Sequence, residues 1–219
     1  MENTLSKTPD RFELSITLPY SDWYLRHYDL KELEKHVSFF NLMTYDMHGT
    51  LDRGNKWTGE QLNAHTNLTE IKDSLDLLWR KGVNAENVVM GLAFYGRGYT
   101  VASPSCVEPG CLFLSGSVET HCYYETGILP NNDLMRIMRT KGLSSKLYED
   151  AAVKVTHWRD QWVSYDDEET LKTKTDFARE QCLGGVHVWA IGHDMKYANF
   201  TEALYRVANR RGPRRRHHG

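Results

Sequence analysis

Four short apolar runs constrain the fold of this chain more than any other feature of its sequence. They lie at residues 12–18, 39–45, 87–94 and 184–190. The second run (FFNLMTY) and the third (NVVMGLAF) are almost continuously apolar, which is typical of strands that are buried on both faces of a parallel sheet. We therefore predict four strands of such a sheet.

Segments with helical periodicity separate these runs. Residues 69–81 (TEIKDSLDLLWRK) place their apolar side chains on one helical face, and Gly82 follows as a stop signal. The spacing also predicts helices at residues 29–37 and 167–181. Because strands and helices alternate, the sequence predicts an α/β fold with a parallel sheet.

The connection between the last two runs is much longer than one crossover helix requires. It covers residues 99–165, within which 131–138 has the pattern of a capped helix, and 153–158 and 161–164 have the pattern of short strands. We predict an inserted α+β subdomain here.

The charge distribution argues against two classes of partner. A formal net charge of −2 gives no general attraction to nucleic acid or to anionic membranes. Basic residues gather only in the final stretch, RVANRRGPRRRHHG, which lacks the aromatic side chains of a nucleic-acid platform. We expect residues 201–219 to be a disordered basic tail, residues 1–11 an N-terminal extension, and residues 12–200 the folded domain.

The four cysteines indicate disulfides rather than a metal site. They are Cys106, Cys111, Cys122 and Cys182, and they contain no pair of C-x-x-C knuckles. Three fall within one short stretch, which favours disulfides in an oxidising compartment, with the connectivity left open. The opening residues MENTLSKTPDRF have no apolar core of a signal peptide. We reconcile the two observations by expecting the chain to begin partway through a longer protein.

Chemically active side chains follow the predicted strands. Functional residues of parallel α/β folds cluster at the carboxyl ends of strands, and such ends here carry Met43, Tyr45, Asp46, Tyr95, Arg97 and Trp189. A phenol, a carboxylate, a guanidinium and an indole face suit recognition of a neutral, hydroxyl-rich ring. Each residue also has an ordinary explanation taken singly: Trp189 in the core, Arg97 paired with a carboxylate, Tyr45 and Asp46 merely ending a strand.

Taken together and in order, five segments resemble glycoside hydrolase family 18, the chitinases and chitinase-like lectins. The segments are MTYDMHG, GLAFYGRGY, YYETG, WVSYDDEETLKTK and GGVHVWAIGHD. The resemblance covers about residues 12–198, and the stretches SITLPYSDWYLRHYD and LNAHTNLTEIKDSLDLLWRKG are similar to the fungal, killer-toxin-like branch. It implies a partial TIM (β/α)8 barrel, the last four of eight strands, with the insertion at 99–165 between the last two strands.

The resemblance also implies a substrate and residue roles. The substrate is chitin or chitooligosaccharides, cleaved by endo-hydrolysis in which the N-acetyl group of the sugar is itself the nucleophile. Tyr45 would donate to the acetamido oxygen, Asp46 would contact the sugar, and Met43 would line the pocket. The family further implies an extracellular location, with no cofactor and no metal.

The remaining roles concern the walls of the pocket. Arg97 and Tyr95 would hold neighbouring hydroxyls, and Trp189 would form the floor beneath the distorted ring. Glu125, from the insertion, would reach a sugar from the side. Leu51 stands where many relatives carry a tryptophan that stacks on a sugar, which predicts weaker binding there.

The general acid is missing from this pattern. The family places it in an Asp-x-x-Asp-x-Asp-x-Glu segment at the fourth strand, and the 219 residues contain no such segment. Residues 73–80 (DSLDLLWR) match only the first two aspartates and have helical periodicity, so we predict a helix there; we interpret the acidic run at 166–169 as a helix N-terminus.

Three interpretations of the chain follow from the missing acid. It is a chitinase fragment that is inactive alone and depends on the N-terminal half of the barrel, a non-catalytic, lectin-like chitin binder, or an incomplete gene product. In the first case the open strand edges predict poor solubility without a partner.

Overall fold

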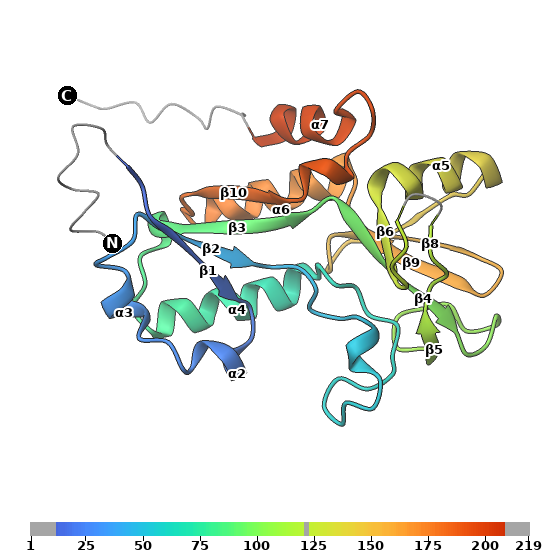
Figure 1. Cartoon of the computed structure of the whole chain (residues 1–219), viewed down its shortest axis with the longest axis horizontal. Helices are drawn as coiled ribbons and strands as arrows, with labels where there is room; N and C mark the ends of the chain where they lie inside the picture. Colours follow the sequence, from blue (N-terminus) through green and yellow to red (C-terminus); the bar gives the residue numbers. More distant parts are fainter. Residues whose placement is uncertain (1–11, 121–122, 209–219) are drawn as a thin grey trace.

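The computed structural model describes residues 12–120 and 123–208 and contains two β-sheets (Figure 1). The first is a four-stranded parallel sheet in the order β1-β2-β3-β10. Its strands are β1 (Ser15–Pro19), β2 (Phe39–Met43), β3 (Val88–Ala93) and β10 (Gly185–Trp189). All four predicted strands are therefore confirmed, and β1 and β10 form the edges of this sheet.

Helices α4 (Leu68–Arg80) and α6 (Glu168–Glu180) lie alongside this sheet (Figure 1). The predictions at 69–81 and 167–181 are confirmed. In α4 the buried side chains include Ile71, Leu75 and Leu78 at helical spacing, whereas Asp73 and Asp76 are exposed. The segment that imitates the acid motif is thus a helix that covers the core.

The main core fills the space between the sheet and its helices. It joins Leu42 of β2 and Met90 of β3 to Leu75 of α4 and Phe177 of α6. Two short 3-10 helices, η2 (Ala85–Asn87) and η3 (Ile191–His193), lie next to β3 and β10.

The insertion forms the second sheet, which is antiparallel and has the order β5-β4-β9-β8-β7, with β6 paired to β4. The strands are β4 (Tyr95–Val101), β5 (Phe113–Gly116), β6 (Ile128–Pro130), β7 (Lys146–Tyr148), β8 (Val153–Trp158) and β9 (Gln161–Tyr165), and the helix is α5 (Asn131–Lys141). The helix and the last two strands lie where the sequence predicts them. The sheet begins at Tyr95 rather than residue 99, because β4 follows β3 almost directly.

Two sequence-based predictions are wrong. Residues 29–37 form only a four-residue helix, α3 (Leu30–Leu33), preceded by a similar one, α2 (Asp22–Leu25). Residues 201–208 are not a disordered tail, since they belong to helix α7 (Asn199–Ala208), which buries Phe200, Ala203 and Val207. Helical spacing of these apolar residues outweighs the basic composition. The predicted extension at 1–11 and the residues from 209 onward lie outside the described residues.

One disulfide joins Cys106 to Cys111, with 5.7 Å between their Cα atoms. Cys182 is exposed and has no disulfide partner within the described ranges, and Cys122 lies outside them. Among the described residues, no helix is both long and apolar enough to cross a membrane, and no three or more acidic, histidine or cysteine side chains gather as metal ligands would.

The acidic run at 166–169 divides into two roles. Asp167 caps α6 by accepting hydrogen bonds from the backbone N–H groups of Glu169 and Thr170, as the sequence predicts. Asp166 instead is buried, and its carboxylate lies 2.5 Å from the Nζ of the equally buried Lys174. The pair joins the last strand of the insertion to α6.

Candidate functional site

Asp46 is the centre of the candidate site. It follows β2 with a φ of 58°, and its Oδ1 accepts hydrogen bonds from the Tyr95 hydroxyl at 2.6 Å and from Arg97 Nε at 2.8 Å. Tyr95 and Arg97 are alternate residues of β4, so their side chains lie on the same face of that strand. The site therefore joins an end of the parallel sheet to the first strand of the insertion.

His65, which no sequence pattern singled out, holds the backbone of Asp46 in place through a hydrogen bond. Its ring is fully buried, its Nδ1 accepts the backbone N–H of Asp46 at 3.3 Å, and its Nε2 donates to the carbonyl of Tyr95 at 3.2 Å. Burial lowers the pKa of His65, which agrees with a neutral ring in this bonding pattern. No local pattern identifies His65, because its partners lie far from it in sequence.

The carboxylate of Asp46 is ionised at neutral pH. Burial alone would raise the pKa of Asp46, but the hydrogen bond from Arg97 and the positive charge of Arg97 outweigh it and hold that pKa well below its usual value. Among the described residues, Asp46 is the only hydrogen-bond partner of the Arg97 side chain, through Nε. The ordinary explanation for Arg97, an ion pair, is thus correct, and neither Nη group has a hydrogen-bond partner in the part of the chain that the structure describes.

Tyr45 lies beside this cluster, with its ring packed against the backbone of Gly91. A Cβ at Gly91 of β3 would come within 2.7 Å of the Tyr45 ring, so only glycine admits the phenol there. The ring makes edge contacts with Tyr95 and His187, at centroid distances of 6.3 and 6.1 Å. Met43 packs against the same small cluster.

The Tyr45 hydroxyl is a hydrogen-bond donor at any physiological pH. Burial, followed by the nearby Asp46 charge, raises the pKa of Tyr45 to about 12. Such a phenol retains its proton and presents it to an acceptor.

Trp189 ends β10 with 58% of its surface exposed. It is two residues after His187 and therefore on the same face of the strand, and His187 contacts the Tyr45 ring. Trp189 is thus not a core residue, and its indole lies on the side of β10 that faces the cluster.

Glu125 is exposed and no direct contact joins it to Asp46 in the described structure. Its nearest described interaction is with Tyr123. Burial raises the pKa of the Tyr123 phenol, and the charge of the Glu125 carboxylate raises it further. The rings of Tyr123 and Tyr95 both contact His193, at 5.5 and 5.7 Å. The structure thus brings Tyr45, Asp46, Tyr95 and Arg97 together. Glu125 is connected to these residues only indirectly, through Tyr123 and His193.

A second network holds the loop that follows Asp46. His48 lies 3.1 Å from Asp52 through Nδ1 and 2.8 Å from Glu70 through Nε2. Burial would lower the pKa of His48, but these two carboxylates raise it to about 9. The charged ring anchors the 3-10 helix η1 (Thr50–Asp52), on which Leu51 is 93% exposed.

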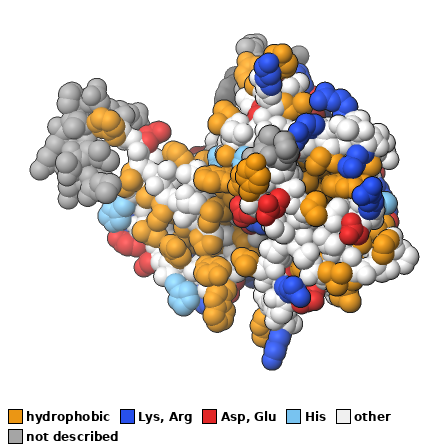
Figure 2. Space-filling model, turned by 45° about the vertical axis from the view of Figure 1, so that its right-hand side comes forward, with side chains coloured by type: hydrophobic (Ala, Val, Ile, Leu, Met, Phe, Trp, Pro, Cys, Tyr) orange, Lys and Arg blue, Asp and Glu red, His pale blue; other side chains and the backbone are white. Residues whose placement is uncertain are grey.

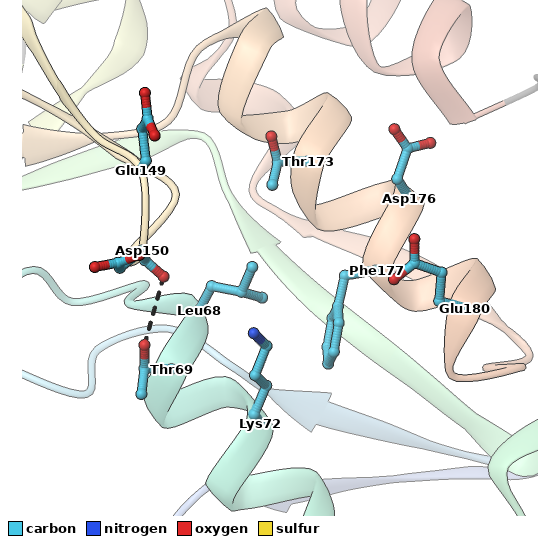
Figure 3. Close-up of a pocket in the computed structure, with 9 residues that line it drawn as sticks. All are labelled: Leu68, Thr69, Lys72, Glu149, Asp150, Thr173, Asp176, Phe177 and Glu180. Atoms are coloured by element: carbon cyan, nitrogen blue, oxygen red, sulfur yellow. Dashed lines mark hydrogen bonds between the residues drawn. The ribbon is translucent and has the colours of Figure 1, made fainter.

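A hollow of about 800 Å³ opens at this network and includes Asp46 and Arg97 in its lining. Another, of about 600 Å³, lies between α4 and α6, away from the strand ends (Figure 3). Four of its nine lining residues are acidic, namely Glu149, Asp150, Asp176 and Glu180, and one is a lysine, Lys72. Only the first hollow is continuous with the cluster around Asp46.

Solved structures share this fold. One of YKL-39 in the presence of chitooligosaccharides (GlcNAc4) superimposes with a TM-score of 0.84 at 22% identity, covering 94% of this chain and 61% of that one. The class V chitinase of Nicotiana tobaccum gives a TM-score of 0.82 at 19% identity, covering 95% of this chain and 60% of that one.

Two of the curated relatives are fungal proteins that are much longer than this chain. A "Probable chitinase LysM11" of Penicillium expansum is 31% identical over 201 residues, which is 81% of this chain and 18% of that protein. "Killer toxin subunits alpha/beta" of Kluyveromyces lactis is 32% identical over 132 residues, which is 60% of this chain and 11% of that protein. The chain therefore spans less than a fifth of either relative.

Most of the sequence matches one protein family. Residues 1–194 match the family described as "Glycosyl hydrolases family 18". Because the match covers most of the sequence, and the resemblance of the five strand-end and insertion segments points the same way, this chain belongs to glycosyl hydrolases family 18.

Proposed function

We propose that this chain is the sugar-binding half of a chitinase barrel and holds chitooligosaccharides at the cluster around Asp46. The observation that carries the proposal is the convergence of Tyr45, Asp46, Tyr95 and Arg97 at one end of the parallel sheet. A fixed carboxylate, a protonated phenol and guanidinium Nη groups that have no hydrogen-bond partner among the described residues suit a neutral ring with hydroxyl and amide substituents.

The half-barrel interpretation rests on the four-stranded sheet. Eight parallel strands close a barrel of this class, and here β1 and β10 each have one neighbour in the described sheet. The residues of β10 are only partly buried or exposed, and Figure 2 shows broad hydrophobic areas on the surface. These features support a chain that needs four further strands to cover its sheet.

Tyr45 has the clearest chemical role. In a substrate-assisted reaction the acetamido oxygen attacks the anomeric carbon, the bond to the leaving oxygen breaks, and water later opens the cyclic intermediate. The Tyr45 hydroxyl would donate to the acetamido group and orient it. A donor in such a position contributes about 3 kcal/mol to lowering the barrier in a dry site. Trp189 would stack under the reacting ring.

Departure of the leaving oxygen requires a proton. The Asp-x-x-Asp-x-Asp-x-Glu segment that supplies it in the family is not in this sequence. We therefore expect no release of chitooligosaccharides from chitin by the purified 219-residue chain. Detectable release above the level of a Tyr45→Phe variant would contradict this part of the proposal.

Binding is tested by titrating chitotetraose against the chain and a Trp189→Ala variant. We expect the variant to bind about tenfold more weakly, because a stacking face is lost. Tyr205→Ala is the matched control, since Tyr205 is an exposed aromatic of α7. Equal, negligible binding by the chain and both variants would eliminate a sugar-binding role.

A lectin-like, non-catalytic role is the second candidate, favoured by the retained cluster without the acid. Adding a separately produced N-terminal half of a family barrel distinguishes the two. Restored hydrolysis that requires Tyr45 supports a split chitinase, and saturable binding without hydrolysis supports a lectin.

An extracellular location belongs to the same proposal. A relative of Penicillium expansum, 29% identical over 192 residues, bears the name "Secreted chitinase LysM12", and the Cys106–Cys111 disulfide suits an oxidising compartment.

A further inference from the structure

The sequence contains two Asn-x-Thr triplets, and the structure distinguishes them. They lie at residues 67–69 (NLT) and 199–201 (NFT). Such a triplet is the acceptor signal for an N-linked glycan on a secreted protein, and its asparagine is then found at the surface. Because short triplets also arise by chance, each asparagine is compared below for whether the fold itself already needs it.

Asn67 has a structural role that accounts for it without a glycan. It is the N-cap of α4, and its Oδ1 accepts the backbone N–H of Thr69 at 3.0 Å. Leu68, which follows it, is buried and donates its backbone N–H to the carbonyl of Ala151 at 2.9 Å. Asn67 itself is half-buried. Asparagine is among the preferred N-cap residues, so the start of α4 is sufficient to explain this position.

Asn199 has no such role, because another residue holds the start of its helix. Asn199 is the first residue of α7. The carboxylate of Asp194 accepts the backbone N–H groups of Phe200 at 2.9 Å and of Thr201 at 2.8 Å. It also accepts the Thr201 hydroxyl at 2.6 Å. Within the described ranges the Asn199 side chain makes no hydrogen bond. Its amide therefore contributes nothing to the capping of α7.

The surroundings of Asn199 leave room for a large hydrophilic group. Residues 196–199 are all exposed, and 74% of the surface of Tyr197 is open to solvent. The chain turns at Ala198, which has a φ of 53°, and α7 then lies at the outer side of the molecule, beyond α6 (Figure 1). An oligosaccharide on the Asn199 amide would thus extend into water without displacing a buried side chain.

An independent feature of the chain agrees with the compartment in which such glycans are added. The disulfide between Cys106 and Cys111 suits an oxidising compartment, and N-linked glycans are transferred in the oxidising lumen through which secreted proteins pass. The disulfide lies in the insertion and the triplet at 199–201 lies at the start of α7. Two separate parts of the molecule therefore point to the same route.

We propose that Asn199 is an N-glycosylation site. The inference rests on the extracellular location that belongs to the proposed function. In the transfer, Nδ2 of Asn199 forms a bond to C1 of the first N-acetylglucosamine of a lipid-diphosphate-linked oligosaccharide, and the bond from C1 to the phosphate oxygen breaks. The lipid diphosphate leaves with the electron pair of that bond, and the amide passes one proton to a basic group of the transferase. Nothing is oxidised or reduced.

The folded structure also fixes when the transfer takes place. The Thr201 hydroxyl, which the triplet has to present to the transferase, is bound by Asp194, and Phe200 between the two acceptor residues is only 7% exposed. The triplet is therefore readable only before α7 docks. We expect an Asp194→Ala variant, in which docking of α7 is weakened, to be glycosylated at least as fully as the unmodified chain.

The test produces the full chain behind a cleavable secretory leader in a eukaryotic host. The chain from which the leader has been removed is collected from cells and medium together, so that folding and export do not affect the result. Its mass is measured before and after treatment with a peptide N-glycosidase. We expect a glycan on the unmodified chain and none on Asn199→Gln or Thr201→Val. Asn67→Asp is the matched control, because it removes the other triplet and retains an N-cap oxygen for α4; it should keep the glycan.

The outcomes bear on this inference alone. A leader-free chain without a glycan overturns it, and so does a glycan that survives Asn199→Gln or disappears in Asn67→Asp. The added leader carries the chain into the secretory pathway whatever its natural location, and Asn199 is not among the residues around Asp46. Failure at Asn199 therefore leaves the extracellular location and the sugar-binding role standing, and failure of chitotetraose binding leaves the glycan at Asn199 standing.

Discussion

The two sheets of this molecule differ in how fully their strands are buried. All five residues of β9 in the insertion are buried, whereas no residue of β10 in the parallel sheet is. The insertion has a core of its own around Tyr99, Phe113 and Trp162. Antiparallel strands pair locally through short turns, whereas a parallel sheet that does not close on itself leaves two open edges. In the described residues the inserted subdomain therefore buries its strands more fully than the parallel sheet that carries it.

The largest expected effect concerns the core of the insertion. Trp162 is fully buried, packs on Tyr99 and donates its Nε1 proton to the carbonyl of Val107 at 2.8 Å. We expect Trp162→Ala to lower the free energy of unfolding by about 4 kcal/mol, and Val188→Ala of β10 by about 1 kcal/mol. Urea denaturation followed by circular dichroism measures both. A larger loss for Val188→Ala would reverse the comparison.

The next effect concerns the joint between the two sheets. Lys174 Nζ contacts both oxygens of Asp166, at 2.5 and 2.7 Å, and the Thr66 hydroxyl at 2.9 Å. Lys174→Met leaves a buried carboxylate without its cation, so we expect a loss of about 3 kcal/mol. Adding Asp166→Asn to the same protein removes that charge and should restore more than half of the loss in urea denaturation. A double variant as unstable as the single one would show that the charge is not the cause.

The smallest expected effect is a pH dependence of the free energy of unfolding. It arises from His48, in the loop that follows β2. Because Asp52 and Glu70 raise the pKa of His48 from 6.5 to about 9, its charge stabilises the fold fully below pH 6.5, and this stabilisation is lost as the pH rises through about 9. Glu70 is partly exposed, so solvent screening limits the contribution to about 1–2 kcal/mol. The stability difference between the chain and His48→Gln should shrink over this pH range in urea denaturation. A constant difference would contradict the assignment.

The strands and long helices could be predicted from the sequence because their signals are local. The runs at 39–45 and 87–94 are apolar throughout, and α4 shows one clear apolar face. Helix α7 was not predicted, because the arginines around it drew the interpretation toward a tail although Phe200, Ala203 and Val207 have helical spacing. The short helix α3 was predicted too long, since Asp29 caps a single turn and the chain then turns toward β2.

The site was partly predictable for a similar reason. Residues that end parallel strands meet at one edge, so Tyr45, Asp46, Tyr95 and Arg97 could be grouped without coordinates. His65 could not, because it lies in a loop and gains its meaning only from contacts with Asp46 and the Tyr95 carbonyl. Trp23 of α2 and Trp57 of the loop after β2 likewise lie far apart in sequence, and only the folded chain shows that they line one hollow.

The absence of a side chain at Gly91 ties together two positions that lie far apart in the chain. A methyl group there would meet the Tyr45 ring at 2.7 Å and the carbonyl oxygen of Leu42 at 2.8 Å, and the backbone cannot move aside without disturbing the strand pairing. Loss of the phenol at position 45 alone would therefore not admit a larger residue at position 91, because the Leu42 carbonyl would remain in the way. Gly91 thus sets the spacing between β2 and β3 as well as the place of the Tyr45 ring, so that its replacement would disturb the strand pairing even in a variant without the phenol.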